Sequence, residues 1–178
     1  SNILRLGSGR VRQVGEQLEP FLSGETPTAS EPYRLTNLAG HFALVDYSDA
    51  FVDRLNTGRG DEALDLAIAG AELMLPESSD DIVRSASGWT DDMFMVSSLL
   101  SRVGQRTGDS RYGEVVGRLL TSYTETLRRA DGLFVHSTRG PQAWGRGNGF
   151  AILGMMEALT YLGTTWADRT QVLGIYRS

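Results

Sequence analysis

Three segments of the chain share one arrangement, and this repeat limits the fold more than any other feature of the sequence. Each has a helix-forming stretch, a turn with glycine and a second helix-forming stretch, and the segments are residues 52–75, 101–127 and 158–177. Recurrence at about fifty residues is typical of repeated helical hairpins. Gly58, Gly108 and Gly163 stand where a helix would end in a left-handed residue. We predict one all-α domain over residues 1–178, built from stacked antiparallel hairpins.

The turns and the apolar spacing within these segments support this prediction. Asp61 and Asp109 follow the first two turns, at positions where the next helix needs an N-cap. Apolar residues between positions 96 and 103 recur at helical spacing. Strand signals are few, because only residues 132–137 suggest a short extended piece, and residues 23–32 are predicted to form a polar loop.

Composition and charge exclude several classes of function. The 178 residues are 40% hydrophobic, which is enough for one packed domain, and carry a net charge of −5. Basic residues are scattered singly, so we expect no nucleic-acid partner. The chain has no cysteine and only two histidines, too few ligands for a zinc site, so we expect neither metal nor cofactor. His41 is expected to be packed or solvated.

Hydropathy predicts a soluble chain. The first 13 residues lack the apolar stretch of a signal peptide, and no later apolar run is long enough to span a bilayer. We therefore expect no membrane contact and a cytoplasmic location. A periplasmic or secreted location stays open, because a removed signal peptide leaves no trace in the sequence.

Two adjacent carboxylates in the stretch GWTDDMFM form the first candidate site. Thr90 is a suitable N-cap, which would place Asp91 and Asp92 in the first turn of a helix, where the helix dipole favours negative charge. That interpretation needs no function. The apolar neighbours suggest a partly dry site, in which two close carboxylates repel each other and one keeps its proton, as a general acid must. The residues alone leave both interpretations open.

A glycine-rich stretch between positions 132 and 150 forms the second candidate site. Three glycines alternate with Arg146 and Asn148 just before an apolar helix that is expected to start near Phe150. A helix N-terminus with an arginine beside it suits an anion such as a carboxylate. The alternative is a flexible turn in which Asn148 is the N-cap. His136 lies in the same stretch and is the better site candidate of the two histidines.

Four motifs, in this order, resemble one family of glycoside hydrolases. They are WTDDMFM (89–95), RTGDSRY (106–112), DGLFVH (131–136) and WGRGNGF (144–150). Their order and separations are similar to those of the unsaturated glucuronyl and rhamnogalacturonyl hydrolases, over about residues 80–163. The resemblance implies an (α/α)6 barrel. It also implies a substrate, an oligosaccharide with a 4,5-unsaturated uronic acid at its non-reducing end.

The resemblance implies roles for the residues of these motifs. Asp91 falls on the family's acid, which protonates C4 of the unsaturated ring and then acts as base while water adds at C5. Asp92 stands where the family usually lacks an acid, and we expect it to tune Asp91 within the substrate site. The residues expected to bind the sugar are His136, Trp144, Arg146 and Asn148. Of these, Trp144 offers an apolar ring face and Arg146 offers paired donors.

Two further positions are assigned from the same resemblance. Phe150 stands where the family usually has a second tryptophan, and we count it among the substrate-binding residues. The family's second polar residue, an Asp or Asn on an earlier helix, falls best on Asn37, about a helix length before the first glycine turn. Asp53 is the rival position, but the repeat makes Thr57 and Gly58 a hairpin turn.

The chain is shorter than a complete (α/α)6 barrel, and alternative functions also stay open. Six hairpins of about fifty residues need roughly 300 residues, and this chain holds a little over three hairpins. A partial barrel leaves apolar helix faces uncovered, so we expect a homo-oligomer or a missing barrel half. One alternative function is a non-catalytic carbohydrate-binding or scaffold protein on the same hairpins. The other is a sugar epimerase or isomerase, which the scarcity of histidine disfavours.

Overall fold

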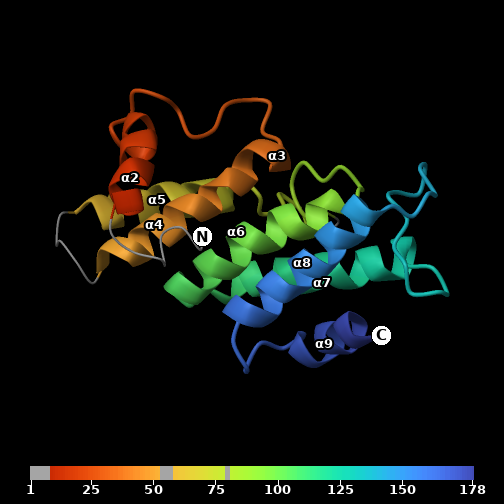
Figure 1. Ribbon diagram of the computed structural model, residues 1–178. Coiled ribbons are helices and arrows are strands. Elements are labelled where there is room, and N and C mark those ends of the chain that lie inside the picture. Colours follow the sequence, from red (N-terminus) through yellow and green to blue (C-terminus); the bar gives the residue numbers. More distant parts are fainter. Residues whose placement is uncertain (1–8, 53–57, 79–80) are drawn as a thin grey trace.

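The computed structural model describes residues 9–52, 58–78 and 81–178, and its regular elements are helices (Figure 1). In chain order they are α2 (Gly9–Leu22), α3 (Leu35–Leu38), the 3-10 helix η1 (Ala39–His41), α4 (Phe42–Val52), α5 (Arg59–Glu72), α6 (Asp91–Thr107), α7 (Ser110–Leu127), α8 (Gly145–Tyr161) and α9 (Arg169–Arg177). The described ranges contain no strand, so the all-α prediction is confirmed. The predicted extended piece at 132–137 is reduced to an isolated antiparallel bridge between Arg128 and Phe134.

Helices α4 to α9 form three hairpins, which pair α4 with α5, α6 with α7, and α8 with α9. Gly58, Gly108 and Gly163 at their turns have φ of 71°, 74° and 74°, the left-handed conformation that was predicted for them. The first helices of the hairpins pack side by side, and α6 and α8 lie in front of α7 in Figure 1. Helix α7 packs in turn against α9. This arrangement is part of an (α/α)6 barrel, as expected.

The core lies between the helices of these hairpins. The apolar spacing predicted along α6 buries Val96, Leu99 and Val103 completely, and Leu119 and Leu120 on α7 are equally buried. Each such side chain stabilises the fold by about 1.5–3 kcal/mol relative to exposure. Packing of these stripes, rather than helix propensity alone, holds the hairpins together.

Helices α6 and α8 approach each other closely at Gly154. A Cβ atom built on this glycine would lie 2.3 Å from the carbonyl oxygen of Met93 and 3.0 Å from the amide nitrogen of Phe94. Only a residue without a side chain fits against that backbone. The contact sets the N-terminal halves of α6 and α8 side by side, and both candidate motifs lie at these ends.

A buried charged cluster joins the first helices of all three hairpins. Arg102 on α6 pairs with Glu157 on α8, with Nη2 of the arginine 3.3 Å from Oε1, and its Nε lies 3.4 Å from Oδ1 of Asp46 on α4. The guanidinium also lies over the rings of Tyr161 and Phe42, at 4.3 and 5.1 Å. Buried charges need such partners, so this cluster orders the three helices relative to one another.

The helix caps agree with the sequence only in part. Asp109 caps α7 as predicted, because its carboxylate accepts a hydrogen bond from the backbone N–H of Arg111 at 3.0 Å. Asp61 is not the N-cap of α5, since that helix begins at Arg59 and Asp61 lies in its first turn. Thr90 directly precedes α6 as predicted, but its hydroxyl makes no capping bond.

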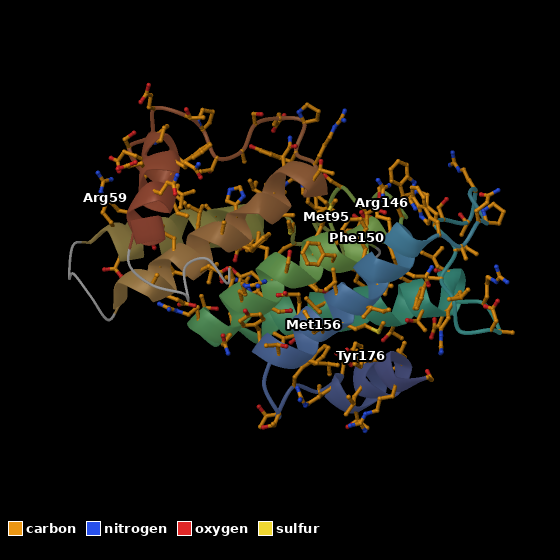
Figure 2. All side chains as sticks on the ribbon, in the orientation of Figure 1. Arg59, Met95, Arg146, Phe150, Met156 and Tyr176 are labelled. Carbon is orange, nitrogen blue, oxygen red and sulfur yellow. The ribbon has the colours of Figure 1, made fainter. Side chains whose placement is uncertain are left out.

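Helix α8 exposes a second apolar face. Ile152, Leu153 and Met156 are 50%, 40% and 40% exposed, and Tyr176 of α9, a helix that packs against α8, is 42% exposed (Met156 and Tyr176 are labelled in Figure 2). Nothing in the described part of the chain covers this face. The expected homo-oligomer or further barrel half therefore stays a prediction, and this face is where it would bind.

No helix within the described ranges combines the length and the apolar character that a membrane crossing requires.

Candidate active site

The N-terminal ends of α6 and α8 bring three predicted site residues together. Asp91 is the first residue of α6, Arg146 is the second of α8, and His136 lies in the loop that joins α7 to α8. Nδ1 of His136 lies 3.6 Å from Oδ2 of Asp91, and Nη2 of Arg146 lies 3.7 Å from Oδ1. The Asp91 side chain is only 12% exposed, whereas that of Arg146 is 57% exposed. The carboxylate is thus enclosed, and the arginine can reach a ligand from solvent.

Two tryptophan rings contact the His136 and Arg146 side chains that face this carboxylate. The imidazole of His136 lies 4.8 Å from the Trp89 ring and 5.0 Å from the Trp144 ring, measured between ring centroids. The guanidinium of Arg146 lies over the Trp144 ring at 4.3 Å, a cation–π contact that orients it. Trp89 and Trp144 are 47% and 43% exposed, so both present apolar surface to a ligand.

Several buried polar atoms of the site have no hydrogen-bond partner among the described residues. They are Oδ2 of Asp91, Nδ1 of His136 and Oγ1 of Thr90. Most buried polar atoms in proteins are paired, because an unpaired one costs about 1–3 kcal/mol. Two of these atoms, Oδ2 of Asp91 and Nδ1 of His136, face each other at 3.6 Å.

Asn148, near the start of α8, makes hydrogen bonds that hold the loop containing His136 in place. Its Oδ1 accepts a hydrogen bond from the N–H of Phe134 at 2.8 Å, and its Nδ2 donates to the carbonyls of Phe134 and Trp144, at 3.0 Å each. Asn148 thus orients this loop and is not the N-cap of α8, and its expected contact with a sugar stays a prediction. Helix α8 begins at Gly145 rather than near Phe150, because the glycines accept helical geometry there.

Gly147 allows Trp144 to fold back over the first turn of α8. A Cβ atom at this glycine would lie 2.7 Å from Nε1 of Trp144 and 2.8 Å from Oγ1 of Thr90. A side chain at this position would push the indole out of the site. The absence of a side chain at Gly147 thus allows Trp144 to pack closely beside Thr90, the residue that precedes α6.

Asp92 points away from Asp91 and does not line the site. It is 1% exposed and accepts hydrogen bonds from the N–H groups of Ser87 and Gly88 and from the hydroxyls of Ser87 and Tyr123. Contact with a substrate, which the sequence suggested, is therefore wrong for this side chain. Burial, and then the Asp92 carboxylate, raise the pKa of Tyr123, so its hydroxyl keeps the proton that it donates.

Asn37 lies in a different part of the fold. It belongs to α3 and lines a cavity of about 190 Å³ with His41 and residues of α2 and α4. His41 is packed, as expected: its Nδ1 donates to the carbonyl of Leu38 at 2.8 Å, and burial lowers its pKa. The structure gives no contact between Asn37 and Asp91, so its place in the substrate site remains a prediction. The rival, Asp53, lies outside the described residues.

Phe150 extends an aromatic row from the site across the first helices of the hairpins. Its ring stacks on Phe94 of α6 at 5.8 Å, and Phe94 meets Phe42 of α4 edge-on at 6.4 Å. Figure 2 shows Phe150 one turn along α8 from Arg146. Phe150 therefore packs beside the site, and its expected contact with a sugar stays a prediction.

The two turn carboxylates lie far from the site, as expected from the hairpins. Asp109 follows the C-terminal end of α6, and 17 residues of helix, about 25 Å, separate it from Asp91. Asp61 is two residues after Arg59, which lies at the opposite end of the molecule from Arg146 (Figure 2). Both are therefore suitable remote controls for the site.

Two residues of the site were not among the predicted ones. Trp89 had a signal, since it stands in the same WTDDMFM motif as Asp91 and indoles often serve as exposed contact surfaces. Tyr123 had none, because its position on α7 fits the apolar spacing of a core residue.

Within the described ranges, no group of three potential metal ligands occurs.

Stacked helical hairpins that bring an enclosed carboxylate, a histidine, an arginine and two indoles together at one end define a protein of the helical-barrel class. A family model described as Glycosyl Hydrolase Family 88 matches residues 81–178. The chain belongs to this family, and the resemblance drawn from its motifs is confirmed at that level.

Two solved structures share the fold. A glycosyl hydrolase family 88 protein from Bacteroides vulgatus is 16% identical with a TM-score of 0.61, and the match covers 94% of this chain and 57% of that one. A polysaccharide lyase is 17% identical with a TM-score of 0.55, over 76% of this chain and 40% of that one. The chain thus spans about half the length of these structures. A search of curated proteins found no match.

Proposed function

We propose that the protein hydrates oligosaccharides that carry a 4,5-unsaturated uronic acid at the non-reducing end, with Asp91 as general acid and base. One observation supports this most: the Asp91 side chain is only 12% exposed, and His136 and Arg146 face its two oxygens at 3.6 and 3.7 Å. Membership of a glycoside hydrolase family supports the reaction class. The specific substrate and the mechanism come from the motif resemblance.

In this mechanism Asp91 acts on the double bond rather than on the anomeric carbon. Its carboxyl proton goes to C4, and the oxygen of a water molecule bonds to C5 while the proton that this water loses returns to Asp91. The resulting hemiketal at C5 opens, and the remainder of the oligosaccharide is released. Most glycosidases use a pair of carboxylates at the anomeric carbon. Here Asp92 is held in hydrogen bonds to Ser87 and Tyr123, so it does not form such a pair with Asp91, and this supports a reaction at the double bond.

The substrate carboxylate would bind at Arg146. This arginine is exposed, is oriented by Trp144, and lies beside the N-terminal ends of α6 and α8, where the helix dipoles favour an anion. A uronate held there would place its ring against Trp144 and its double bond next to Asp91. An ionised Asp91 would repel the negative uronate. The positive charge of Arg146 offsets this repulsion, which is the role that we assign to it.

The test uses the ultraviolet absorbance of the conjugated enol acid, which disappears when C4 is protonated. Lyase-generated oligosaccharides should lose this absorbance in the presence of the protein. Asp91→Asn keeps the size of the side chain but removes the transferable proton, so the rate should fall about 10²- to 10⁴-fold. Asp61→Asn, a remote change of the same kind, should leave the rate unchanged.

An Asp91→Asn variant with the wild-type rate would refute the assignment of the acid. If no unsaturated uronide loses absorbance but the oligosaccharides still bind in calorimetry, the protein is a carbohydrate-binding module rather than an enzyme.

A further inference from the structure

Asp92 ties the turn before α6 to helix α7. Its Oδ2 accepts hydrogen bonds from the N–H groups of Ser87 and Gly88, at 2.8 and 3.0 Å, and from the Tyr123 hydroxyl at 2.7 Å. Its Oδ1 accepts one from Oγ of Ser87 at 2.7 Å, and this Oγ accepts one from the N–H of Trp89 at 3.2 Å. Hydrogen bonds to a carboxylate are strong, and buried ones are costly to lose. We call this set of contacts the Asp92 clamp.

The turn held by the Asp92 clamp carries Trp89 into the site and contacts His136, which belongs to the loop between α7 and α8. Gly88 has φ of 76°, so the chain reverses there and places the Trp89 ring 4.8 Å from that of His136. The next residue, Thr90, donates its backbone N–H to the carbonyl of His136 at 3.0 Å. Both the ring and the backbone of His136 therefore rest on this turn, and its Nδ1 lies 3.6 Å from Asp91.

We propose that Asp92 and Tyr123 are positioning residues that hold Trp89 and His136 against Asp91. Tyr123 belongs to the second helix of its hairpin and is 31 residues from Asp92 in sequence. The Asp92 clamp thus connects the packing of α7 to the geometry of the site. Its effect on turnover rests on the proposed function, whereas its effect on His136 does not.

The experiment compares two Tyr→Phe substitutions on the same helix. Tyr123→Phe removes one donor of the Asp92 clamp and leaves no large cavity. Tyr112→Phe is the matched control, because Tyr112 is also buried on α7 and also donates to a carboxylate, that of Glu72 at 2.6 Å, but lies three turns away. The first readout is the NMR spectrum of the imidazole groups, which contains only His41 and His136.

Tyr123→Phe should shift the ring signals of His136, because the tryptophan ring beside it moves, and should leave those of His41 in place. It should also lower kcat/KM for the unsaturated uronide about 10- to 100-fold, the usual cost of misplacing a catalytic group by up to an ångström. Tyr112→Phe should change neither the His136 signals nor kcat/KM.

Unchanged His136 signals in Tyr123→Phe would overturn the proposal, and so would equal losses of kcat/KM in the two variants. If the wild-type protein turns over no unsaturated uronide, the proposed function fails, yet the NMR comparison still decides whether the Asp92 clamp exists. Should Tyr123→Phe not fold, Ser87→Ala takes its place with the same expectations, since it removes two hydrogen bonds of the clamp, to Asp92 and from Trp89, without touching α7.

Discussion

Gly154 provides a sharp test of how α6 and α8 are held together. A Cβ atom there would lie 2.3 Å from the Met93 carbonyl oxygen, closer than side-chain carbons are found, and backbone cannot rotate out of the way. Gly154→Ala must therefore push the helices apart by most of an ångström. Overpacking of this kind costs about 1–3 kcal/mol. Alanine recovers about 1 kcal/mol through its better helix propensity.

The net effect expected of Gly154→Ala is a loss of up to about 2 kcal/mol, which lowers the melting temperature by up to about 8 °C for a chain of this size. Gly149→Ala is the matched control on the same helix, because nothing lies within 4 Å of the added carbon. It should raise the melting temperature by about 2–4 °C, since only the propensity gain of about 1 kcal/mol remains. Thermal unfolding followed by far-ultraviolet circular dichroism measures both. A Gly154→Ala protein as stable as Gly149→Ala would refute the close approach of the helices.

Three further changes have expected outcomes. Arg146→Lys should raise KM for the uronide more than it lowers kcat, because a point charge replaces a forked donor; steady-state kinetics will separate the two. Glu157→Ala removes one of the two carboxylates that pair with buried Arg102, Glu157 and Asp46, and should cost about 3 kcal/mol in urea unfolding, the lower end of the range for a broken buried pair. Burial lowers the pKa of His41 below its free value of 6.5, so the unfolded chain binds more protons and stability should fall as pH drops below about 6.5. His41→Gln should abolish that slope between pH 5 and 7, as measured by urea midpoints.

Much of the candidate site followed from local sequence. Asp91 and Arg146 each stand at the start of an apolar helix, and the hairpin repeat places those starts at one end of the structure. The site residues of the two motif loops could therefore be expected to meet, and Asp91, His136 and Arg146 do. Asn37 could not be assigned in the same way, because no repeat or turn links α3 to the site.

Asp91 and Asp92 are adjacent in one motif but have different surroundings, and the cause lies outside the motif. Successive side chains on a helix point about 100° apart, so Asp91 and Asp92 had to face different surroundings. Which of them faced the site depended on where α7 and the preceding turn lie, and these supply the donors that hold Asp92. Tyr123, a core residue by its spacing, became a hydrogen-bond donor for the same reason.

The sequence by itself determined the helical hairpins, because their signals are local: apolar residues at helical spacing, and glycines with φ near 70° at the turns. It also identified the two motifs that contain the candidate acid and the arginine, since each motif is a run of contiguous residues. The tertiary structure alone decided which glycine lies against a neighbouring backbone, which carboxylate is held by the clamp and which faces His136 and Arg146, and which face of α8 remains exposed. These depend on contacts between residues that are distant in sequence, and each helix presents several faces that local spacing cannot tell apart.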